Sequence, residues 1–530
     1  MKHSLYAFAA LIFLGILTLS LTVKRTASKV TGFTLARTSK VVNVKFFGAK
    51  GDGITDDTQA IQKAIDETSK SKVTLFFPKG IYIIKSHIDN CKELNYLRNE
   101  GGILIKSNSH LKLDPLATLK AVSNGERQYN IVRIWNGQNI TIEGGTILGE
   151  RNTHRGDDGE WGYGLAIFGS KNIIIKKLSI KDCWGDGINL QVSEPEMQTN
   201  KNIIMRNVIC SNNRRQGMSI EAGENLAFEN CIFEKTHGTA PKSGVDIEPW
   251  NQNVVIRNIK FYKCSFKDNF GNNFLINYSK IINLVVDRCT FTATKPTSVA
   301  QHIYSTSSNN ASFTISNCYF DNNVENILLR GGKGKFLKNQ FNQKVTINYP
   351  EDKDEINKTD SIYFEGNKFT NVVLLASKLN KMTSLKNNEF VSNNTLFLNN
   401  DKSVVIGNKF YNNSESKFIA SSKQTCLLLE NNTFQNNATA AVEVYNNATI
   451  KNNSFINAKQ GILVFPAATN VTVKGNSFKK MQDIAINFLD ENLSRKNKFI
   501  HVSNNISDAN EIINPRLREI LQKDHRNVVK

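Results

Sequence analysis

The chain has 530 residues, room for about two to four average domains or for one long repetitive β-architecture. Its 67 lysines and arginines against 47 aspartates and glutamates give a formal net charge of +20, which favours an anionic partner such as nucleic acid, anionic lipid or acidic polysaccharide. No zinc-ligand spacing or RNA-binding signature accompanies this charge, so we expect no nucleic-acid partner; a lysine-rich solvated surface is the alternative explanation.

The first predicted element is an almost uncharged run at residues 5–23, which follows Lys2 and His3 and precedes Lys24 and Arg25. Its 19 residues are long for the core of a signal peptide and just long enough to span a bilayer. No clear small-x-small cleavage site follows it. Residues 1–29 are therefore predicted to be a signal peptide or an uncleaved membrane anchor. Either one predicts an exported protein that is secreted, periplasmic or anchored outside the cytoplasm.

The entry segment, residues 42–84, has a glycine-rich turn, one helix and one buried strand. Thr55 or Asp56 is expected to cap the helix. The apolar stripe of the helix is expected at Ala60, Ile61, Ala64 and Ile65. The segment reads VNVKFFGAKGDGITDDTQAIQKAID and continues as VTLFFPKGIYII.

This segment resembles the N-terminal cap of the pectate-lyase-superfamily β-helix proteins, which include polygalacturonases, rhamnogalacturonases and phage tailspike depolymerases. The resemblance covers residues 42–84 by sequence and the following repeats by pattern only. It implies a right-handed parallel β-helix that acts on polysaccharide.

A short repeat fills the rest of the chain. An asparagine followed by alternating apolar residues recurs every 23 to 33 residues, at Asn139, Asn172, Asn202, Asn225, Asn253 and Asn283. Later the unit becomes Asn-x-Phe and recurs every 20 to 24 residues, at Phe369, Phe390, Phe410, Phe434, Phe455 and Phe478. Such periods with β-type runs predict an all-β solenoid, because stacked turns bury a face that one turn cannot bury alone. The dense leucine pattern of leucine-rich repeats is absent.

We therefore predict a right-handed parallel β-helix over residues 42–510, with about a dozen turns. Residues 42–84 are its cap, 130–280 its site-bearing turns and 330–510 its scaffold turns. Residues 511–530 are predicted to form a C-terminal tail. The oligomeric state stays open.

Cysteines also recur with the repeat, and four of them precede a phenylalanine by two residues. This placement predicts one column of small, buried, reduced thiols rather than disulfides. The column is expected to contain Cys183, Cys210, Cys231, Cys264, Cys289 and Cys318.

Three successive turns align on their glycines: GDGINLQ at residues 185–191, RQGMSIE at 215–221 and KSGVDIE at 242–248. Their apolar residues are expected to face inward, and their polar residues to form two outward ladders with rungs about 4.8 Å apart. The first ladder is Asn189, Ser219 and Asp246, and the second is Gln191, Glu221 and Glu248. The two preceding turns extend the ladders with Arg133, Trp135 and Phe168.

Like charges on adjacent rungs cost stability unless cations compensate them, and Arg214, Arg215 and Lys242 lie beside Glu221 and Glu248. Carboxylates, aromatic faces and arginines together suit the cleavage of an acidic sugar chain. A structural salt-bridge ladder is the alternative. The predicted catalytic set is Glu248, Asp246 and Glu221, assisted by Asp186. The predicted substrate-binding set is Arg214, Arg215, Lys242, Trp135, Phe168, Trp161, His154, His237, Asn189 and Gln191.

Two loops are expected to form the walls of the site, residues 153–164 with His154 and Trp161, and residues 234–244 with His237. Solvated loops are the alternative for both.

The chain departs from the polygalacturonase pattern, which combines Asn-Thr-Asp, Asp-Asp, Gly-His-Gly and Arg-Ile-Lys. Here WGDG stands at residues 184–187 and RRQG at 214–217, and Gly-His-Gly is missing. Asp186 stands near a polygalacturonase aspartate, but galacturonan hydrolysis itself is not implied.

We expect carboxylate-catalysed hydrolysis of an acidic, uronate-containing polysaccharide, without a cofactor or a metal. One alternative is a lyase that uses Arg214 or Arg215 as base and Ca²⁺ held by Asp246 and Glu248. Another is a non-catalytic glycan-binding surface protein.

Overall fold

The computed structural model describes residues 40–529, with gaps at residues 72, 87–100, 252, 278–279, 296–298, 300, 306–311, 322–326, 330–332, 343–344, 348–358, 373, 377–379, 393–395, 414–416, 422–424, 490–498, 509–511, 514–517 and 520–527. The predicted signal peptide or anchor, residues 1–29, lies outside the described residues. Among the described helices, none has the length and apolarity needed to cross a bilayer.

The N-terminal cap begins with β1 (Val41–Asn43), the 3₁₀ helix η1 (Val44–Phe47) and β2 (Asp52–Asp56), and α2 (Thr58–Ser71) follows. The Asp56 carboxylate accepts hydrogen bonds from the Thr58 backbone N–H at 3.0 Å and from the Thr58 hydroxyl, which satisfies one free donor of the first turn. Ile61, Ala64 and Ile65 are fully buried, as the predicted apolar stripe requires. The predicted helix is thus confirmed.

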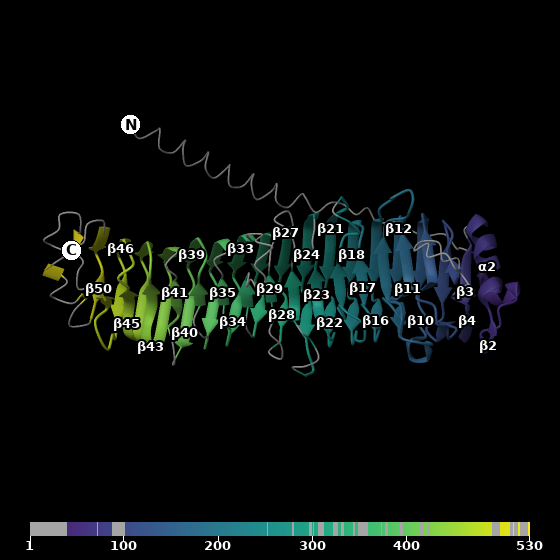
Figure 1. Ribbon diagram of the computed structural model, residues 1–530, viewed down its shortest axis with the longest axis horizontal. Helices are drawn as coiled ribbons and strands as arrows, with labels where there is room; N and C mark the ends of the chain where they lie inside the picture. Colours follow the sequence, from purple (N-terminus) through teal and green to yellow (C-terminus); the bar gives the residue numbers. More distant parts are fainter. Residues whose placement is uncertain are drawn as a thin grey trace, which may run out of the picture. The chain divides into compact units, whose positions relative to one another are not determined.

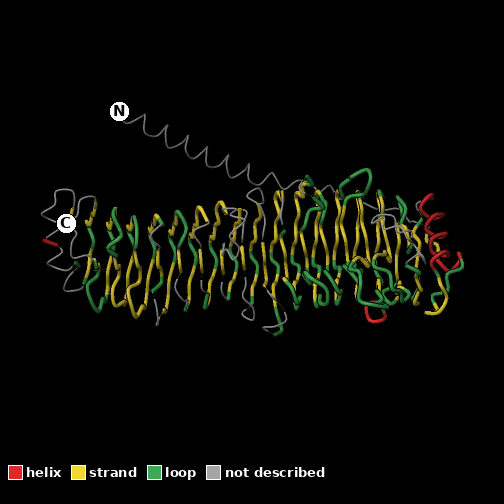
Figure 2. The backbone as a smooth tube through the Cα atoms, in the orientation of Figure 1, coloured by secondary structure: helices red, strands yellow, loops and turns green. Residues whose placement is uncertain are grey.

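All the strand pairings within the named strands are parallel, and the strands fall into three columns that run along one axis (Figures 1 and 2). The first column is a 19-stranded sheet, which we call the long sheet. It comprises β1, β3 (Thr74–Phe77), β6 (His110–Leu113), β9 (Gln138–Glu143), β12 (Lys171–Lys176), β15 (Lys201–Arg206), β18 (Glu224–Glu229), β21 (Val255–Tyr262), β24 (Lys280–Asp287), β27 (Ser312–Ser316), β30 (Lys333–Leu337), β33 (Thr359–Glu365), β36 (Asn380–Lys386), β39 (Lys402–Ile406), β42 (Cys426–Glu430), β44 (Ala448–Lys451), β46 (Asn470–Lys474), β49 (Phe499–Ser503) and β51 (Val528–Val529).

The second column, which we call the short-strand column, follows the long sheet around the corner of each turn. It comprises β2, β4 (Gly80–Ile84), β7 (Ala117–Ala121), β10 (Thr146–Leu148), β13 (Ser179–Lys181), β16 (Ile209–Ser211), β19 (Ile232–Glu234), β22 (Ser265–Lys267), β25 (Thr290–Thr292), β28 (Tyr319–Phe320), β31 (Gln340–Phe341), β34 (Lys368–Thr370), β37 (Glu389–Val391), β40 (Lys409–Asn413), β43 (Thr433–Val444), β45 (Ser454–Val464), β47 (Ser477–Lys479) and β50 (Ile506–Ser507).

The third column, which we call the site column, completes each turn. It comprises β5 (Ile103–Leu104), β8 (Gln128–Trp135), β11 (Trp161–Phe168), β14 (Ile188–Gln191), β17 (Met218–Ile220), β20 (Val245–Ile247), β23 (Asn272–Ile276), β26 (Gln301–Ser305), β29 (Ile327–Leu329), β32 (Val345–Ile347), β35 (Leu374–Ala376), β38 (Leu396–Leu398), β41 (Ile419–Ser421) and β48 (Ile486–Phe488). The long strands β43 and β45 contribute their second halves to it. The parallel β-solenoid is confirmed, with more turns than the dozen expected.

The Asn-x-Phe repeat is explained by two ladders in the interior. The phenylalanines stack ring on ring, for example Phe369, Phe390 and Phe410 with centroids 4.6 Å apart and planes within 4°. The asparagine two residues earlier is buried, and its amide donates to the amide oxygen one turn later, as from Asn388 to Asn408 at 3.0 Å. Each turn thereby repeats the same contacts, which is why the pattern persists in the sequence.

The six cysteines are buried and unpaired, as predicted. Cys231, Cys264, Cys289 and Cys318 form one column, in which the Cys264 and Cys289 backbone N–H groups lie 3.3 and 3.4 Å from the sulfur of the next cysteine. The column continues into the asparagine ladder, because the Cys318 N–H donates to Asn339 at 2.9 Å.

The predicted single column of six is wrong for the other two cysteines. Cys210 pairs in register with Phe233, so it occupies the phenylalanine position of the repeat, and Val208 stands where a cysteine was expected. Cys183 lies at the next corner, where its N–H donates to Asn213 at 3.1 Å.

Candidate functional site

The two predicted polar ladders are present on the site column. Strands β14, β17 and β20 pair so that Asn189, Ser219 and Asp246 are register partners. The second ladder continues just beyond the strand ends: the Glu221 N–H donates to the Leu190 carbonyl at 2.8 Å, and the Glu248 N–H to the Ile220 carbonyl at 3.0 Å. Glu221 and Glu248 therefore stand on adjacent rungs.

A cavity of about 340 Å³ opens over the second ladder. It is lined by Gln128, Trp161, Tyr163, Gln191, Arg215, Glu221, Glu248, Pro249, Trp250 and Asn277. Five of these were predicted as site residues: Trp161, Gln191, Arg215, Glu221 and Glu248. The cavity combines two carboxylates with aromatic rings, the combination that suits a sugar ring with its hydroxyl groups.

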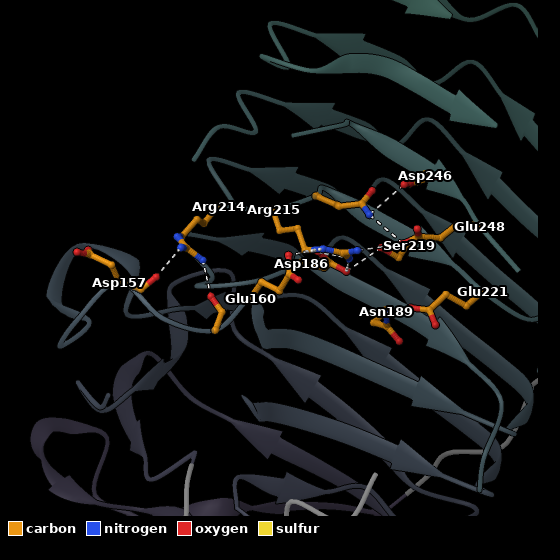
Figure 3. Close-up of polar contacts among 12 residues, drawn as sticks. Asp157, Glu160, Asp186, Asn189, Arg214, Arg215, Ser219, Glu221, Asp246 and Glu248 are labelled. Carbon is orange, nitrogen blue, oxygen red and sulfur yellow. Dashed lines mark hydrogen bonds and ion pairs between the residues drawn. The ribbon is translucent and has the colours of Figure 1, made fainter. Parts of the chain in front are cut away.

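Arg215 is the centre of the charged network, and only 14% of its side chain is exposed. Its guanidinium contacts Asp186 at 3.1 Å, Glu248 at 3.3 Å and Glu160 at 3.4 Å (Figure 3). Burial alone would lower the pKa of this guanidinium, but the carboxylates of Asp186 and Glu248 outweigh it and raise the pKa. Arg215 is therefore a permanent cation that supplies the compensation expected for the stacked glutamates.

Glu221 is held between two amides and is 8% exposed. Asn189 donates to one of its oxygens at 2.7 Å and Gln191 to the other at 2.8 Å. Burial, followed by the charge of Glu248, raises the pKa of Glu221 to about 8. At neutral pH this carboxyl group therefore carries a proton at the edge of the cavity.

Asp186 and Asp246 are completely buried, and neither is among the residues that line the cavity. Asp186 accepts a hydrogen bond from the Ser219 hydroxyl at 2.7 Å, and burial raises its pKa to about 6 although Arg215 opposes the shift. The pKa of Asp246 is raised well above its ordinary range by burial and then by Glu248. Gln216 donates to both Asp246 and Glu248 at 3.1 Å. The two aspartates therefore contact Arg215 and Gln216 without lining the cavity themselves.

The aromatic residues lie differently from the expectation of exposed stacking faces. Phe168 is only 2% exposed, because Trp135 packs edge-on against it with ring centroids 5.5 Å apart. Together with Trp161 and Tyr163 they form one small apolar cluster. The prediction that Phe168 is exposed is wrong. Trp161 lines the cavity, with Trp135 and Phe168 packed in the same cluster.

Arg214 and His154 lie among the residues that anchor the loop between β10 and β11, here called the wall loop (residues 149–160). The Arg214 guanidinium lies 3.7 Å above the Trp184 ring and donates to the Gly159 and Asp157 carbonyls at 2.8 and 3.1 Å (Figure 3). His154 stacks on the other side of Trp184 at 3.7 Å, and its Nδ1 lies 2.7 Å from Glu150 Oε1. Neither Arg214 nor His154 lines the cavity.

Two further predicted binding residues lie beside the site rather than in it. Arg151 donates to His237 Nδ1 at 3.1 Å, and this contact ties the second predicted wall to the wall loop. Lys242 precedes β20, and its side chain is not one of those that line the cavity.

Sequence reasoning missed Gln128, Pro249, Trp250 and Asn277, which line the cavity, and Gln216, which donates to Glu248. Tyr163 and Glu160 were expected only as part of the 153–164 wall; Tyr163 lines the cavity and Glu160 contacts Arg215. Pro249 and Trp250 directly follow Glu248, so the segment EPW carried a usable signal. Asn277 continues the second ladder one rung further, because its N–H donates to the Ile247 carbonyl at 2.8 Å. Within the described part of the chain, no group of three or more His, Cys, Asp or Glu side chains is arranged to hold a metal ion.

Comparisons with known proteins agree with this architecture. Residues 41–290 match the family model "Rhamnogalacturonase A/epimerase, pectate lyase-like", and residues 343–478 match "Right handed beta helix region". The predicted right-handed parallel β-helix and the resemblance to the pectate-lyase superfamily are thereby confirmed.

Three curated relatives illustrate the range. An uncharacterized protein, YclG of Bacillus subtilis, is 32% identical over 42% of this chain and 41% of its own length. Plasmin and fibronectin-binding protein A of Streptococcus pneumoniae is 27% identical over 42% of this chain and 31% of its own length. Alginate lyase 7 of Azotobacter vinelandii is 30% identical over 36% of this chain and 22% of its own length. The chain spans less than half the length of these relatives.

Proposed function

We propose that this protein hydrolyses glycosidic bonds of a polysaccharide, with Glu221 as general acid and Glu248 as the carboxylate that works opposite it. One observation carries this proposal: two carboxyl groups line one cavity in different electrostatic environments. Glu221 is buried between amides and keeps its proton, whereas Glu248 is ion-paired with Arg215 at 3.3 Å. Glycoside hydrolysis requires a pair of carboxyl groups of which one carries a proton and the other is a carboxylate.

In the proposed reaction each group has one step. Trp161 and Trp250 offer apolar surface to a sugar ring, and Gln128 and Asn277 offer amides to its hydroxyl groups. Glu221 donates its proton to the leaving glycosidic oxygen as the bond to the anomeric carbon breaks. Glu248 activates a water molecule or attacks the anomeric carbon itself, and Arg215 holds its carboxylate in place.

The lyase alternative is less well supported. An arginine that acts as base must lose its proton, yet Asp186 and Glu248 raise the pKa of Arg215. Arg214 is engaged with the wall loop and Trp184, outside the cavity.

The proposal is tested by incubating the protein with a panel of polymers: alginate, polygalacturonate, rhamnogalacturonan and neutral dextran. We expect new reducing ends without the absorbance near 235 nm that marks the unsaturated product of a lyase. Absorbance at that wavelength would show that the protein cleaves by elimination and would overturn the proposed hydrolysis. Binding without any cleavage would favour a glycan-binding surface protein.

The pH dependence of cleavage should report the proton on Glu221. Since the pKa of this group is raised to about 8, the general acid is present below that pH and is lost above it. We expect kcat/KM to fall on the alkaline side of about pH 8, with an apparent value that belongs to the coupled carboxyl cluster. A rate that keeps rising through pH 9 would contradict this role for Glu221.

We further propose that the polysaccharide is acidic and the protein acts outside the cytoplasm, as residues 1–29 predict. The formal net charge of +20 attracts polyanions. Glu221, whose pKa is raised to about 8, keeps its proton at neutral pH and therefore does not repel them. Affinity for an acidic oligosaccharide should fall between low salt and 0.1 M, where screening acts over about 10 Å. The salt series of a neutral oligosaccharide serves as control, and tighter binding of the neutral one would count against an acidic substrate.

A further inference from the structure

A second polar cluster lies on the site column in turns that were predicted to be scaffold only. Lys417 contacts Glu443 at 2.7 Å, and the Tyr445 hydroxyl donates to the other oxygen of Glu443 at 3.3 Å. The Tyr445 ring stacks on Phe465 with centroids 3.8 Å apart and planes within 15°. We call these four residues the distal cluster.

Glu443 and Tyr445 of the distal cluster occupy the same register positions as Asp246 and Glu248 of the candidate site. The register passes strand by strand from β20 through β23, β26, β29, β32, β35, β38 and β41 to β43, and it makes Glu443 the counterpart of Asp246. Tyr445, two residues later, is the counterpart of Glu248. Eight rungs of about 4.8 Å separate the two sets on one face, a span of roughly 38 Å. Figure 1 shows this path from β17 through β23, β29 and β35 to β41.

The resemblance between the two places extends to the cation or amide beneath the carboxylate. Gln216 stands two residues before Met218 and donates to Asp246 one rung later at 3.1 Å. Lys417 stands two residues before Ile419 and donates to Glu443 one rung later at 2.7 Å. In the distal cluster, however, Tyr445 replaces the second carboxylate. The distal cluster can therefore bind a sugar, but it lacks the pair of carboxyl groups needed to cleave one.

The other ion pairs between neighbouring turns make a useful contrast. Lys451 and Glu430, on the long sheet, are 3.1 Å apart, and among the described residues neither has a cation–π contact. In the distal cluster the carboxylate is 8% exposed and is combined with a hydroxyl and two stacked rings. A carboxylate, an ammonium and a hydroxyl beside apolar rings match the hydroxyl groups and the apolar face of a sugar ring.

We infer that the distal cluster is a sugar-binding subsite that holds a remote part of the same polysaccharide chain whose scissile bond lies in the cavity. This inference rests on the proposed function. It assigns to the later turns a role in binding long chains, since a short oligosaccharide in the cavity cannot span eight rungs.

The test compares Tyr445→Ala with the wild type on the polymer of the panel that the wild type cleaves fastest, used as full-length chain and as tetrasaccharide. We expect KM for the polymer to rise about two- to ten-fold, the range for the loss of one aromatic contact. The kcat values and all constants for the tetrasaccharide should stay unchanged. Tyr319→Ala is the matched control, because Tyr319 is 40% exposed on the short-strand column, away from this face.

A second variant guards against a folding defect. Glu443→Gln keeps the shape of the carboxylate and should give the same polymer-selective loss, whereas Glu430→Gln on the long sheet should give none. If Tyr445→Ala and Glu443→Gln leave the polymer-to-tetrasaccharide ratio of KM unchanged while the wild type cleaves both, this inference alone is overturned. If the wild type neither cleaves nor binds any polymer of the panel, the proposed function fails and the inference fails with it.

Discussion

The Glu248→Gln protein should lose polysaccharide cleavage by about 10²- to 10⁴-fold, the usual worth of a positioned acid or base. Its melting temperature should stay equal to that of the wild type or rise slightly. Glutamine keeps an oxygen that can accept from Arg215 and Gln216, and Arg215 retains Asp186 and Glu160 as partners. Loss of the Glu248 charge also removes a repulsion that raises the pKa values of Glu221 and Asp246.

Initial rates on the polymer panel measure the loss of cleavage, and thermal melts measure the melting temperature, for the wild type and the Glu248→Gln protein. Glu224→Gln is the control, since Glu224 pairs with Lys201 at 3.4 Å on the long sheet and should affect neither quantity. A Glu248→Gln protein that is less stable yet fully active would contradict the catalytic role of Glu248 and favour a structural salt-bridge ladder.

The Arg215→Met protein should be destabilised by about 3–5 kcal/mol, the usual result of removing one partner of a buried ion pair. Methionine fills the space of the aliphatic stem but leaves Asp186 buried without its cation. The loss should be larger at pH 8 than at pH 5. The folded-state pKa of Asp186, already raised to about 6, rises further without Arg215, so the buried group binds a proton that the unfolded chain releases. Stability is then lost as pH rises through this window.

Urea unfolding at the two pH values measures the effect. Arg206→Met is the matched control, because Arg206 pairs with Glu229 at 2.6 Å on the exposed long sheet, where such a pair contributes about 1 kcal/mol at most. An Arg215→Met protein with equal losses at pH 5 and pH 8 would show that Asp186 does not depend on this guanidinium.

The fold and the ladders could be predicted from the sequence because, in a solenoid, each strand residue pairs with the residue at the same position of the next repeat. Aligning three glycines was enough to pair Asn189 with Ser219 and Asp246, because alternation along each strand then fixes which side chains face outward. The prediction of a single cysteine column was wrong where this alignment was not applied. Val208-Ile209-Cys210 matches Cys-x-Phe only when Cys210 is placed at the phenylalanine position.

The residues that face the cavity were harder to predict, because the loops between strands do not repeat from one turn to the next. Arg214 precedes Arg215 directly, yet it points to the carbonyls of the wall loop while Arg215 points to the carboxylates. Phe168 is outward on its strand, but Trp135 from the preceding turn covers it. These outcomes depend on contacts between segments tens of residues apart, which one sequence does not reveal. The boundaries drawn between site-bearing and scaffold turns stay predictions.

The cap helix α2 has a consequence for association between molecules. Parallel strands that stack in register leave unpaired N–H and C=O groups at each end of the stack, and such an edge can accept a strand from another chain. Figure 1 shows α2 at the N-terminal end. The helix buries Ile61, Ala64 and Ile65, and its Gln62 side chain exchanges two hydrogen bonds of 2.9 Å with the backbone of Leu104. A helix has no free backbone edge along its length, so the site column ends here against a helix and not in a free strand edge. Pairing of β5 with a strand from another copy is thereby disfavoured.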